Sequence, residues 1–297
     1  MPYVCQSQTF QPNSSADFIF PNQVTQYLAG VASFQFSYGT IDHKVQQFGL
    51  SLASTSSYDS TANQSTVRVT ATGILSDASG NTIDADASYV TVSVLAWTGI
   101  ANPDLVLSAS YTAASGGQSS NINLPGSLLP LLNAGLSGFN LNYGSDDYHV
   151  GAILAQVAPG QNGSQGFLTA QAYMRDASGD QAQNPTASGV LLANTATNSG
   201  LVIQPYTRQD VGEQNIPMGV PLSSAMALLT GFQVQFPDGD DHHVLEIGAG
   251  PDACYVNPKD STRVLTSGVW AWMSDQHQIG QDNTKSSASI LVIGIPQ

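Results

Sequence analysis

Residues 33–45 of this chain read SFQFSYGTIDHKV, residues 138–150 read GFNLNYGSDDYHV, and residues 231–244 read GFQVQFPDGDDHHV. Each copy begins with an alternation of apolar and polar residues, which is typical of a strand with one buried face. A short glycine-containing turn follows. The copy ends in aspartate, histidine or tyrosine, lysine or histidine, and valine. The third copy has one extra residue in its turn, so the pattern indicates a repeated strand–turn–strand element.

Two further landmarks repeat in the same order. Three aspartates stand 99 residues apart each time, and they are Asp77, Asp176 and Asp275. An Ala-Ser pair opens an apolar run at residues 87–88, 187–188 and 288–289. Three landmarks at one spacing predict an internal repeat with a period near 100 residues. That period exceeds the length of a solenoid repeat, so we expect each copy to have its own core.

The repeat predicts an all-β protein. Short strands separated by closely spaced turns favour antiparallel β-sandwiches, so we expect three tandem sandwich units of about 100 residues in a pseudo-threefold arrangement. The expected divisions are an N-terminal arm at residues 1–17 and units at residues 18–110, 111–208 and 209–297. Helical structure is expected only as short turns at residues 131–132 and 225–229.

Composition limits the classes of partner. Only 9% of the 297 residues are charged, and 7 basic against 21 acidic residues give a net charge of −14. Because such a chain offers no basic patch, nucleic acid and anionic membranes are not expected as partners. No apolar run is long enough to span a membrane, so membrane insertion is not expected. Residues 1–20 show no signal peptide. We expect a secreted or surface-exposed protein, including a particle component or one exported by a non-classical route.

The two cysteines, Cys5 and Cys254, allow one disulfide. Such a bond would attach the N-terminal arm to the last third of the chain, and it would require an oxidising compartment. The alternative is two unrelated buried thiols.

Four of the five histidines fall in the first landmark. One interpretation is a ligand site beside each turn, where the aspartate orients an imidazole or accepts hydrogen bonds from hydroxyl groups. The alternative is a turn capped by its aspartate, with the histidine packed at the start of a strand. Tyr148 stands where the other copies have His43 and His242, which excludes an obligatory metal ligand at that position. The candidate ligand-binding residues are Asp42, His43, Asp147, Tyr148, His149, Asp241, His242, His243, Trp272, Asp275 and His277.

An aromatic pair precedes the last of these residues. Trp270 and Trp272 share one face of a strand because residues two apart in a strand point the same way. An exposed indole beside Asp275 and His277 would form a sugar platform, since the ring covers the apolar face of a sugar and the polar groups bind its hydroxyls. If that face is the inner one, the indoles are core residues instead.

Cofactor and catalytic signatures are weak or missing. The acidic turn with Asp238, Asp240 and Asp241 has oxygen ligands suited to calcium, although it lacks EF-hand spacing and solvated carboxylates are the simpler interpretation. His242 and His243 are adjacent on a strand and point to opposite faces, so no zinc site is expected. Nucleophile, zinc-protease and nucleotide-binding motifs are absent from the sequence, and only two glutamates are present. We therefore expect no enzymatic activity and no cofactor.

The order of elements in each unit resembles the H-type lectin domain. In the third unit the resemblance lies in Gly231-Phe232, the segment 241–244, residues 272–275 and the apolar strand 290–294. It implies a small antiparallel sandwich whose chains associate as trimers, so three fused units would imitate the trimer in one chain. This chain departs from the family pattern, because the tryptophan two residues before the aspartate is replaced by Leu75, Met174 and Met273.

Together these features predict a non-enzymatic, lectin-like protein that binds carbohydrate or surface glycans. Repetition suits this class, because several weak sites give avidity. The alternative is a structural assembly protein, such as a capsid, spike, fibre or sheath component, that uses the same units for contacts between proteins. The expected partners are accordingly glycans or other protein subunits, and the chain could form a homo-oligomer.

Overall fold

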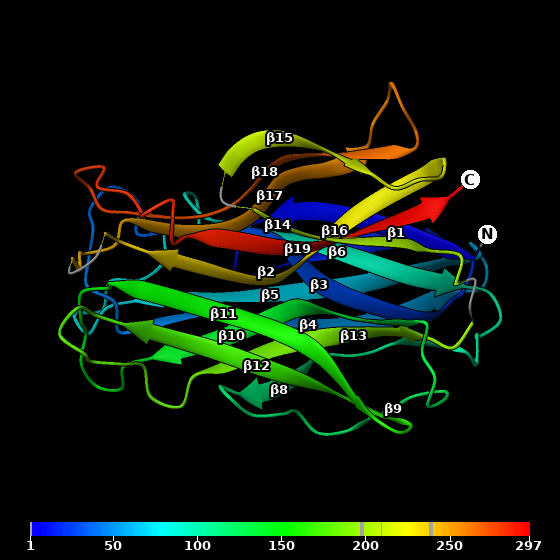
Figure 1. Cartoon of the computed structure of the whole chain (residues 1–297), viewed down its shortest axis with the longest axis horizontal. Coiled ribbons are helices and arrows are strands. Elements are labelled where there is room, and N and C mark those ends of the chain that lie inside the picture. The colour runs from blue at the N-terminus through cyan, green and yellow to red at the C-terminus, as the bar shows by residue number, and fades with distance from the viewer. Residues whose placement is uncertain (1, 197–198, 209, 238–239) are drawn as a thin grey trace.

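The computed structural model describes residues 2–196, 199–208, 210–237 and 240–297. In these ranges the chain forms 19 strands, arranged in three antiparallel sheets (Figure 1). The described residues contain no helix that could cross a membrane. The prediction of an all-β chain built from antiparallel sheets is confirmed.

We name the sheets A, B and C. In order across sheet A the strands are β1 (Tyr3–Phe10), β6 (Tyr89–Thr98), β3 (Val24–Ser37), β17 (Glu246–Val256), β18 (Arg263–Ser274) and β15 (Asp210–Pro217). Sheet B runs β2 (Ser14–Pro21), β5 (Gln64–Ser76), β4 (Gln47–Asp59), β10 (Leu131–Asn142), β13 (Thr186–Asn194) and β7 (Leu105–Leu107), and β8 (Tyr111–Ala114) also pairs with β13. Sheet C runs β14 (Val202–Arg208), β19 (Ser287–Pro296), β16 (Leu222–Gln235), β11 (Ala152–Asn162), β12 (Gln165–Arg175) and β9 (Ile122–Asn123).

Each sheet combines strands from two of the three sequence segments. The first segment meets the third where β3 pairs with β17, the first meets the second where β4 pairs with β10, and the second meets the third where β11 pairs with β16. Equivalent residue pairs at these junctions are Phe36 with Ile247, Phe48 with Leu141, and Ile153 with Val234. The segments are therefore interleaved in a closed cycle, and the divisions predicted near residues 110 and 208 do not separate whole sheets.

Side-chain alternation explains why these segments are strands. In β5 the side chains of Val67, Val69 and Ala71 are buried, whereas Arg68 and Thr72 between and beside them are exposed. The buried set belongs to one large apolar core that includes residues of all three segments. One face of each such strand therefore packs inward and the other meets solvent.

Three phenylalanines from the three repeats meet inside this core. The ring centroids of Phe34 and Phe139 lie 5.6 Å apart, those of Phe139 and Phe232 5.4 Å, and those of Phe34 and Phe232 5.2 Å. A second, smaller core adds apolar residues from each segment, among them Leu28 and Leu192. The repeated Phe-x-apolar strands thus meet at the centre of the molecule. The pseudo-threefold arrangement itself stays a prediction.

Two local expectations are wrong. Residues 131–132 and 225–229 are not helical turns, because they lie in β10 and β16. These long strands are buried on both faces over part of their length, so they read as continuous apolar runs rather than as alternations. Most of the segment 1–17, predicted as an N-terminal arm, lies in strands, since β1 pairs along β6 and β2 pairs along β5.

Candidate functional site

The ends of the three repeated motifs, residues 42–45, 147–150 and 241–244, contact one another across the segment boundaries. Each segment forms an antiparallel bridge with a neighbour, and the bridges join His43 to Val244, Val45 to Tyr148, and Val150 to His242. The Val45 amide donates to the Tyr148 carbonyl at 2.9 Å, and the Val150 amide donates to the His242 carbonyl at 2.9 Å. We call this cyclic arrangement of residues 42–45, 147–150 and 241–244 the clasp.

The three clasp aspartates each connect two segments in the same way. We call each of these aspartates, together with the residues around it, a corner of the clasp. One oxygen of each carboxylate faces a basic side chain of the preceding segment in the cycle: Asp42 Oδ1 lies 3.4 Å from His243 Nδ1, Asp147 Oδ1 lies 3.9 Å from Lys44 Nζ, and Asp241 Oδ1 lies 3.1 Å from His149 Nδ1. The other oxygen accepts a backbone N–H at 3.1 Å, from Gln276, Ala78 and Ala177 respectively. These aspartates therefore hold neighbouring segments together.

The second set of repeated aspartates stabilises the adjoining turns. Asp77 Oδ1 accepts the N–H groups of Ser79 and Asn81 at 2.9 and 2.8 Å. Burial opposes ionisation of this carboxyl, but the hydrogen bonds from Asn81 and Ser79 outweigh it and lower its pKa. Asp275 Oδ1 accepts the N–H groups of His277 and Ile279, each at 2.8 Å.

The variable aromatic position of the clasp packs on a second aromatic ring in each copy. The centroid distances are 4.9 Å for His43 on Tyr38, 4.9 Å for Tyr148 on Tyr143, and 4.6 Å for His242 on Phe236. All three clasp aromatics are half-buried. Histidine and tyrosine can exchange here because each presents a flat ring to the same aromatic neighbour.

The structure thus brings the predicted clasp residues together, but mainly with one another. Their carboxylates, the Lys44 ammonium group and the imidazoles of His149 and His243 form hydrogen bonds or ion pairs between segments. The imidazoles of His43 and His242 instead face an aspartate of their own segment. Each clasp aromatic packs beside its turn, as in the alternative interpretation, but each clasp aspartate contacts a neighbouring segment rather than capping its own turn. The Asp42 corner differs from the others because ligand atoms of Asp42, Asp275 and His277 lie within 4.8 Å of one another, as they would around a metal ion.

The tryptophan pair lies on the outer face of sheet A. Trp270 and Trp272 are stacked with centroids 4.4 Å apart and an interplanar angle of 23°, which confirms that they share a face. Ala271 and Met273, which alternate with them, belong to the core. Trp272 is only 5% exposed, because it lies over Gly248 on β17 and is stacked against its neighbour. Trp270 is half-buried and is therefore the indole with surface available.

Two glycines shape this face. Gly248 pairs with Trp272, and a side chain at Gly248 would overlap the indole ring. Gly268 has a φ of +64°, and a Cβ there would lie 3.2 Å from Trp270 Cδ1 and 3.3 Å from Asp252 Oδ2. The Trp270 indole and the exposed Asp252 carboxylate therefore converge over the space that Gly268 leaves.

Further polar groups come from neighbouring strands. Gln35 Nε2 donates to Glu246 Oε2 at 3.3 Å, and the Ser274 hydroxyl donates to Glu246 Oε1 at 3.4 Å. Burial, followed by the negative charges of Asp252 and Glu246, raises the pKa of Tyr89 to about 12. We call this set of Gln35, Tyr89, Glu246, Asp252, Trp270 and Trp272 the aromatic–acid face.

Sequence reasoning identified the indole pair but missed the residues around it. Asp252 and Glu246 lie on β17, the hairpin partner of β18, so the β17–β18 hairpin is a signal that could have suggested them. Gln35 and Tyr89 come from the first segment and reach this face only through the β3–β17 junction. Asp275 and His277 lie beyond the end of β18, and His277 is 71% exposed at the Asp42 corner.

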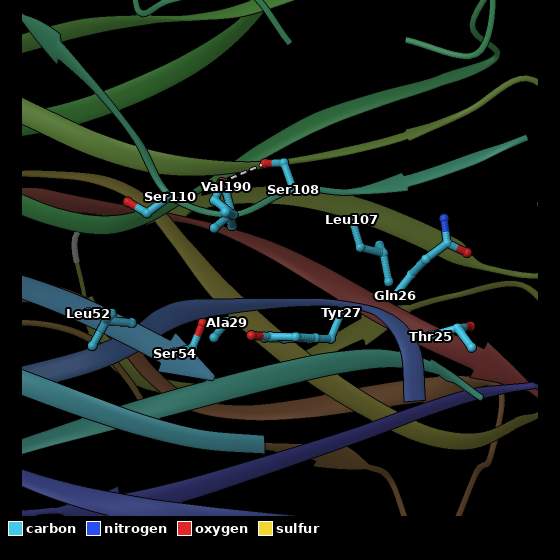
Figure 2. Close-up of a pocket in the computed structure, with 11 residues that line it drawn as sticks. Thr25, Gln26, Tyr27, Ala29, Leu52, Ser54, Leu107, Ser108, Ser110 and Val190 are labelled. Atoms are coloured by element: carbon cyan, nitrogen blue, oxygen red, sulfur yellow. Dashed lines mark hydrogen bonds between the residues drawn. The ribbon is translucent and has the colours of Figure 1, made fainter. Parts of the chain in front are cut away.

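A cavity of about 290 Å³ opens elsewhere, between β3, β4 and the segment 107–110 (Figure 2). Hydroxyl and amide groups contribute much of its lining, including Gln26, Ser54 and Ser108. Tyr27 is the single ionisable side chain among its lining residues. The side-chain amide nitrogen of Gln26 donates hydrogen bonds to the carbonyl oxygens of Asn102 and Leu105. The cavity could hold a small polar molecule, but its lining offers no acid–base pair.

The cysteines and the acidic turn complete the set of predicted sites. Cys5 and Cys254 are both free thiols, and Cys5 donates a hydrogen bond to the Ser224 hydroxyl at 3.4 Å. Of the proposed calcium-binding aspartates, Asp238 lies outside the described residues and Asp240 is exposed. Both oxygens of Asp241 are hydrogen-bonded, one to His149 and the other to the Ala177 N–H.

No family model matches the chain, and no curated protein matches it. The resemblance to the H-type lectin domain therefore stays a prediction.

Proposed function

We propose that this chain is a non-enzymatic protein that binds carbohydrate or surface glycans through the aromatic–acid face of sheet A. One observation carries the proposal. A stacked pair of indoles, of which Trp270 is partly exposed, lies beside the Asp252 carboxylate on the outer face of a sheet.

The chemistry of this face suits a sugar. The C–H groups on one face of a pyranose ring pack against an indole, and carboxylates accept hydrogen bonds from its hydroxyls. Asp252 and Glu246 supply such acceptors, Tyr89 adds a phenol hydroxyl, and Gln35 adds an amide.

We also propose that the three segments are related by an approximate threefold axis. The cyclic strand pairing and the central phenylalanine cluster support this arrangement. The aromatic–acid face is nevertheless confined to one sheet. The residues that take the place of Trp270 on the other sheets are Thr72 on β5 and Gln171 on β12. One sugar platform per chain is therefore expected. Under this proposal the protein is secreted or surface-exposed, and avidity comes from association of several chains.

A glycan array tests the proposal with three variants. Asp252→Asn removes a charge without changing size, Trp270→Ala removes the exposed indole, and Gln171→Ala is the matched control on sheet C. Wild type and the control should bind the same glycans, whereas the two site variants should lose at least tenfold in affinity, measured by calorimetry on the best hit. Thermal unfolding of each variant separates loss of binding from loss of fold. Absence of any glycan hit, or hits that both site variants retain, would refute the proposal.

A second candidate function is structural assembly, and exposed apolar side chains favour it. Ile100 is 93% exposed and Leu128 is 84% exposed. Both lie in loops, after β6 and before β10. Such side chains mark contacts with other proteins where they gather into one patch. Mass photometry would detect regular assemblies, which Ile100→Ser combined with Leu128→Ser should dissociate. A monomer at micromolar concentration would count against this second function.

A further inference from the structure

We propose that the Asp42 corner of the clasp is a binding site for a divalent transition-metal ion of the zinc type. Its ligands are Asp42, Asp275 and His277, from the first and third segments. Ligand atoms of these three residues lie within 4.8 Å of one another before any ion is added. The two aspartates are 8% and 4% exposed, whereas His277 is 71% exposed, so an ion could enter from the histidine side.

The charges at this corner favour a bound cation. Among the described residues, the basic groups that face the two buried carboxylates are all imidazoles: His243 lies 3.4 Å from Asp42, and His242 and His277 lie 3.4 and 3.8 Å from Asp275. No lysine or arginine pairs with either aspartate in the described part of the chain. Two buried carboxylates in close proximity are costly without a permanent positive charge. A divalent ion would neutralise the negative charges of both carboxylates.

The other hydrogen bonds orient the carboxylates toward the common space. One oxygen of each aspartate is already occupied, since Asp42 Oδ2 accepts the Gln276 N–H and Asp275 Oδ1 accepts two backbone N–H groups. The oxygens left for an ion are Asp42 Oδ1 and Asp275 Oδ2. These are the same oxygens that face the imidazoles of His243 and His242. Hydrogen-bonded outer residues of this kind fix ligand orientation in metal sites.

His242 supports this arrangement through an unpaired atom. Its Nε2 is buried and has no hydrogen-bond partner among the residues that the structure describes, whereas its Nδ1 faces Asp275. A hydrogen on Nε2 would have no acceptor among the described residues, which favours the tautomer with its hydrogen on Nδ1, 3.4 Å from Asp275 Oδ2. His242 therefore acts as an outer residue that orients Asp275, and His277 is the imidazole left to bind the ion.

The repeat supplies an internal comparison. At the position of His277 the first and second segments have Ser79 and Ser178. At the corner of Asp147 and Asp77, Lys44 provides a permanent charge to Asp147. Only the Asp42 corner therefore has a third imidazole, that of His277. At this corner no described lysine faces the aspartates, and both Asp42 and Asp275 are buried. Two carboxylates with one nitrogen ligand and room for water suit zinc or cobalt, whereas calcium prefers six to eight oxygen ligands.

The test uses the full chain with Zn²⁺ by calorimetry and Co²⁺ by visible absorption. We expect one ion per chain, a cobalt spectrum of low coordination number, and a higher thermal midpoint with Zn²⁺. His277→Ser, which copies the residue of the other two segments, should weaken binding at least tenfold. His43→Ser removes an imidazole at a different corner and should leave binding unchanged.

Three results would overturn the site. They are no binding of Zn²⁺ or Co²⁺ at submillimolar concentration, equal affinity in His277→Ser and wild type, or calcium bound as tightly as zinc. His277 is exposed, so its serine variant should fold normally, and the thermal midpoint without metal checks this. The outcome is independent of glycan binding, because none of the proposed ligands belongs to the aromatic–acid face.

Discussion

Single residues in this protein acquire their roles from partners that are distant in the sequence. Asp42 and His243 are 201 positions apart, and His149 and Asp241 are 92 apart. The repeated pattern predicted that these residue types recur at equivalent places. It could not predict their partners, because each aspartate faces a basic residue of another segment. Likewise, alternation predicted that Trp270 and Trp272 share a face, but the burial of Trp272 depends on Gly248 in the neighbouring strand.

Cys254 provides a prediction at the scale of one residue. Burial, and next the charge of Cys5, raises the pKa of the Cys254 thiol to about 12. Because the thiolate is the reactive form, a raised pKa means slow alkylation near neutral pH. In a Cys5→Ser background, native Cys254 should react with iodoacetamide at pH 8 at least 100-fold more slowly than the same chain unfolded in urea. Comparable rates in the two states would contradict the buried thiol.

At the scale of elements, alternation predicted the strands 34–38, 139–143 and 232–236 well. It was less informative where strands are buried on both faces. Residues 225–229 lie in β16, which pairs with both β19 and β11, and there the apolar run hides the period of two. The sequence also could not predict which strands share a sheet, because nothing local in β17 indicates that it pairs with β3. Such junctions depend on contacts between whole segments.

The turn after β5 gives a prediction at this scale. Burial opposes ionisation of Asp77, but the hydrogen bonds from Asn81 and Ser79 lower its pKa below the ordinary value of 3.8. The folded state therefore binds this proton less readily than the unfolded state. The stabilisation is present above the ordinary pKa and is lost as the pH falls through the folded pKa.

Asp77→Ala should consequently lower the free energy of unfolding by about 1–3 kcal/mol at neutral pH, because two backbone donors lose their acceptor. The difference from wild type should shrink in acid. Urea unfolding followed from neutral pH to pH 2 measures both effects. A difference that stays constant over this range would show that the ionised carboxylate is not the stabilising group. Thr40→Ala, in the exposed turn after β3, serves as the control.

The whole molecule is a closed cycle of shared sheets, so its segments should unfold together. Phe139 in the second segment contacts Phe34 and Phe232 in the other two. Phe139→Ala should destabilise the chain by about 3–5 kcal/mol, the usual cost of removing a buried phenyl ring. The control is Ile41→Ala, since Ile41 is 58% exposed.

The readout separates a cooperative molecule from independent units. All three tryptophans lie outside the second segment, at positions 97, 270 and 272. If the segments are coupled, Phe139→Ala should shift the tryptophan fluorescence transition as far as the transition in circular dichroism. A fluorescence midpoint that does not move would indicate that the second segment unfolds alone.

The pairing of strands between segments also determines how a truncated piece of this protein would behave. A fragment containing only residues 111–208 would keep the hairpin β11–β12 but lose β16, which covers one side of β11. It would likewise keep β10 without β4. Both strands would then be exposed edge strands with unpaired backbone N–H and C=O groups, and such edges pair with other chains. A fragment meant to isolate one repeat would therefore need designed capping strands, or it would precipitate.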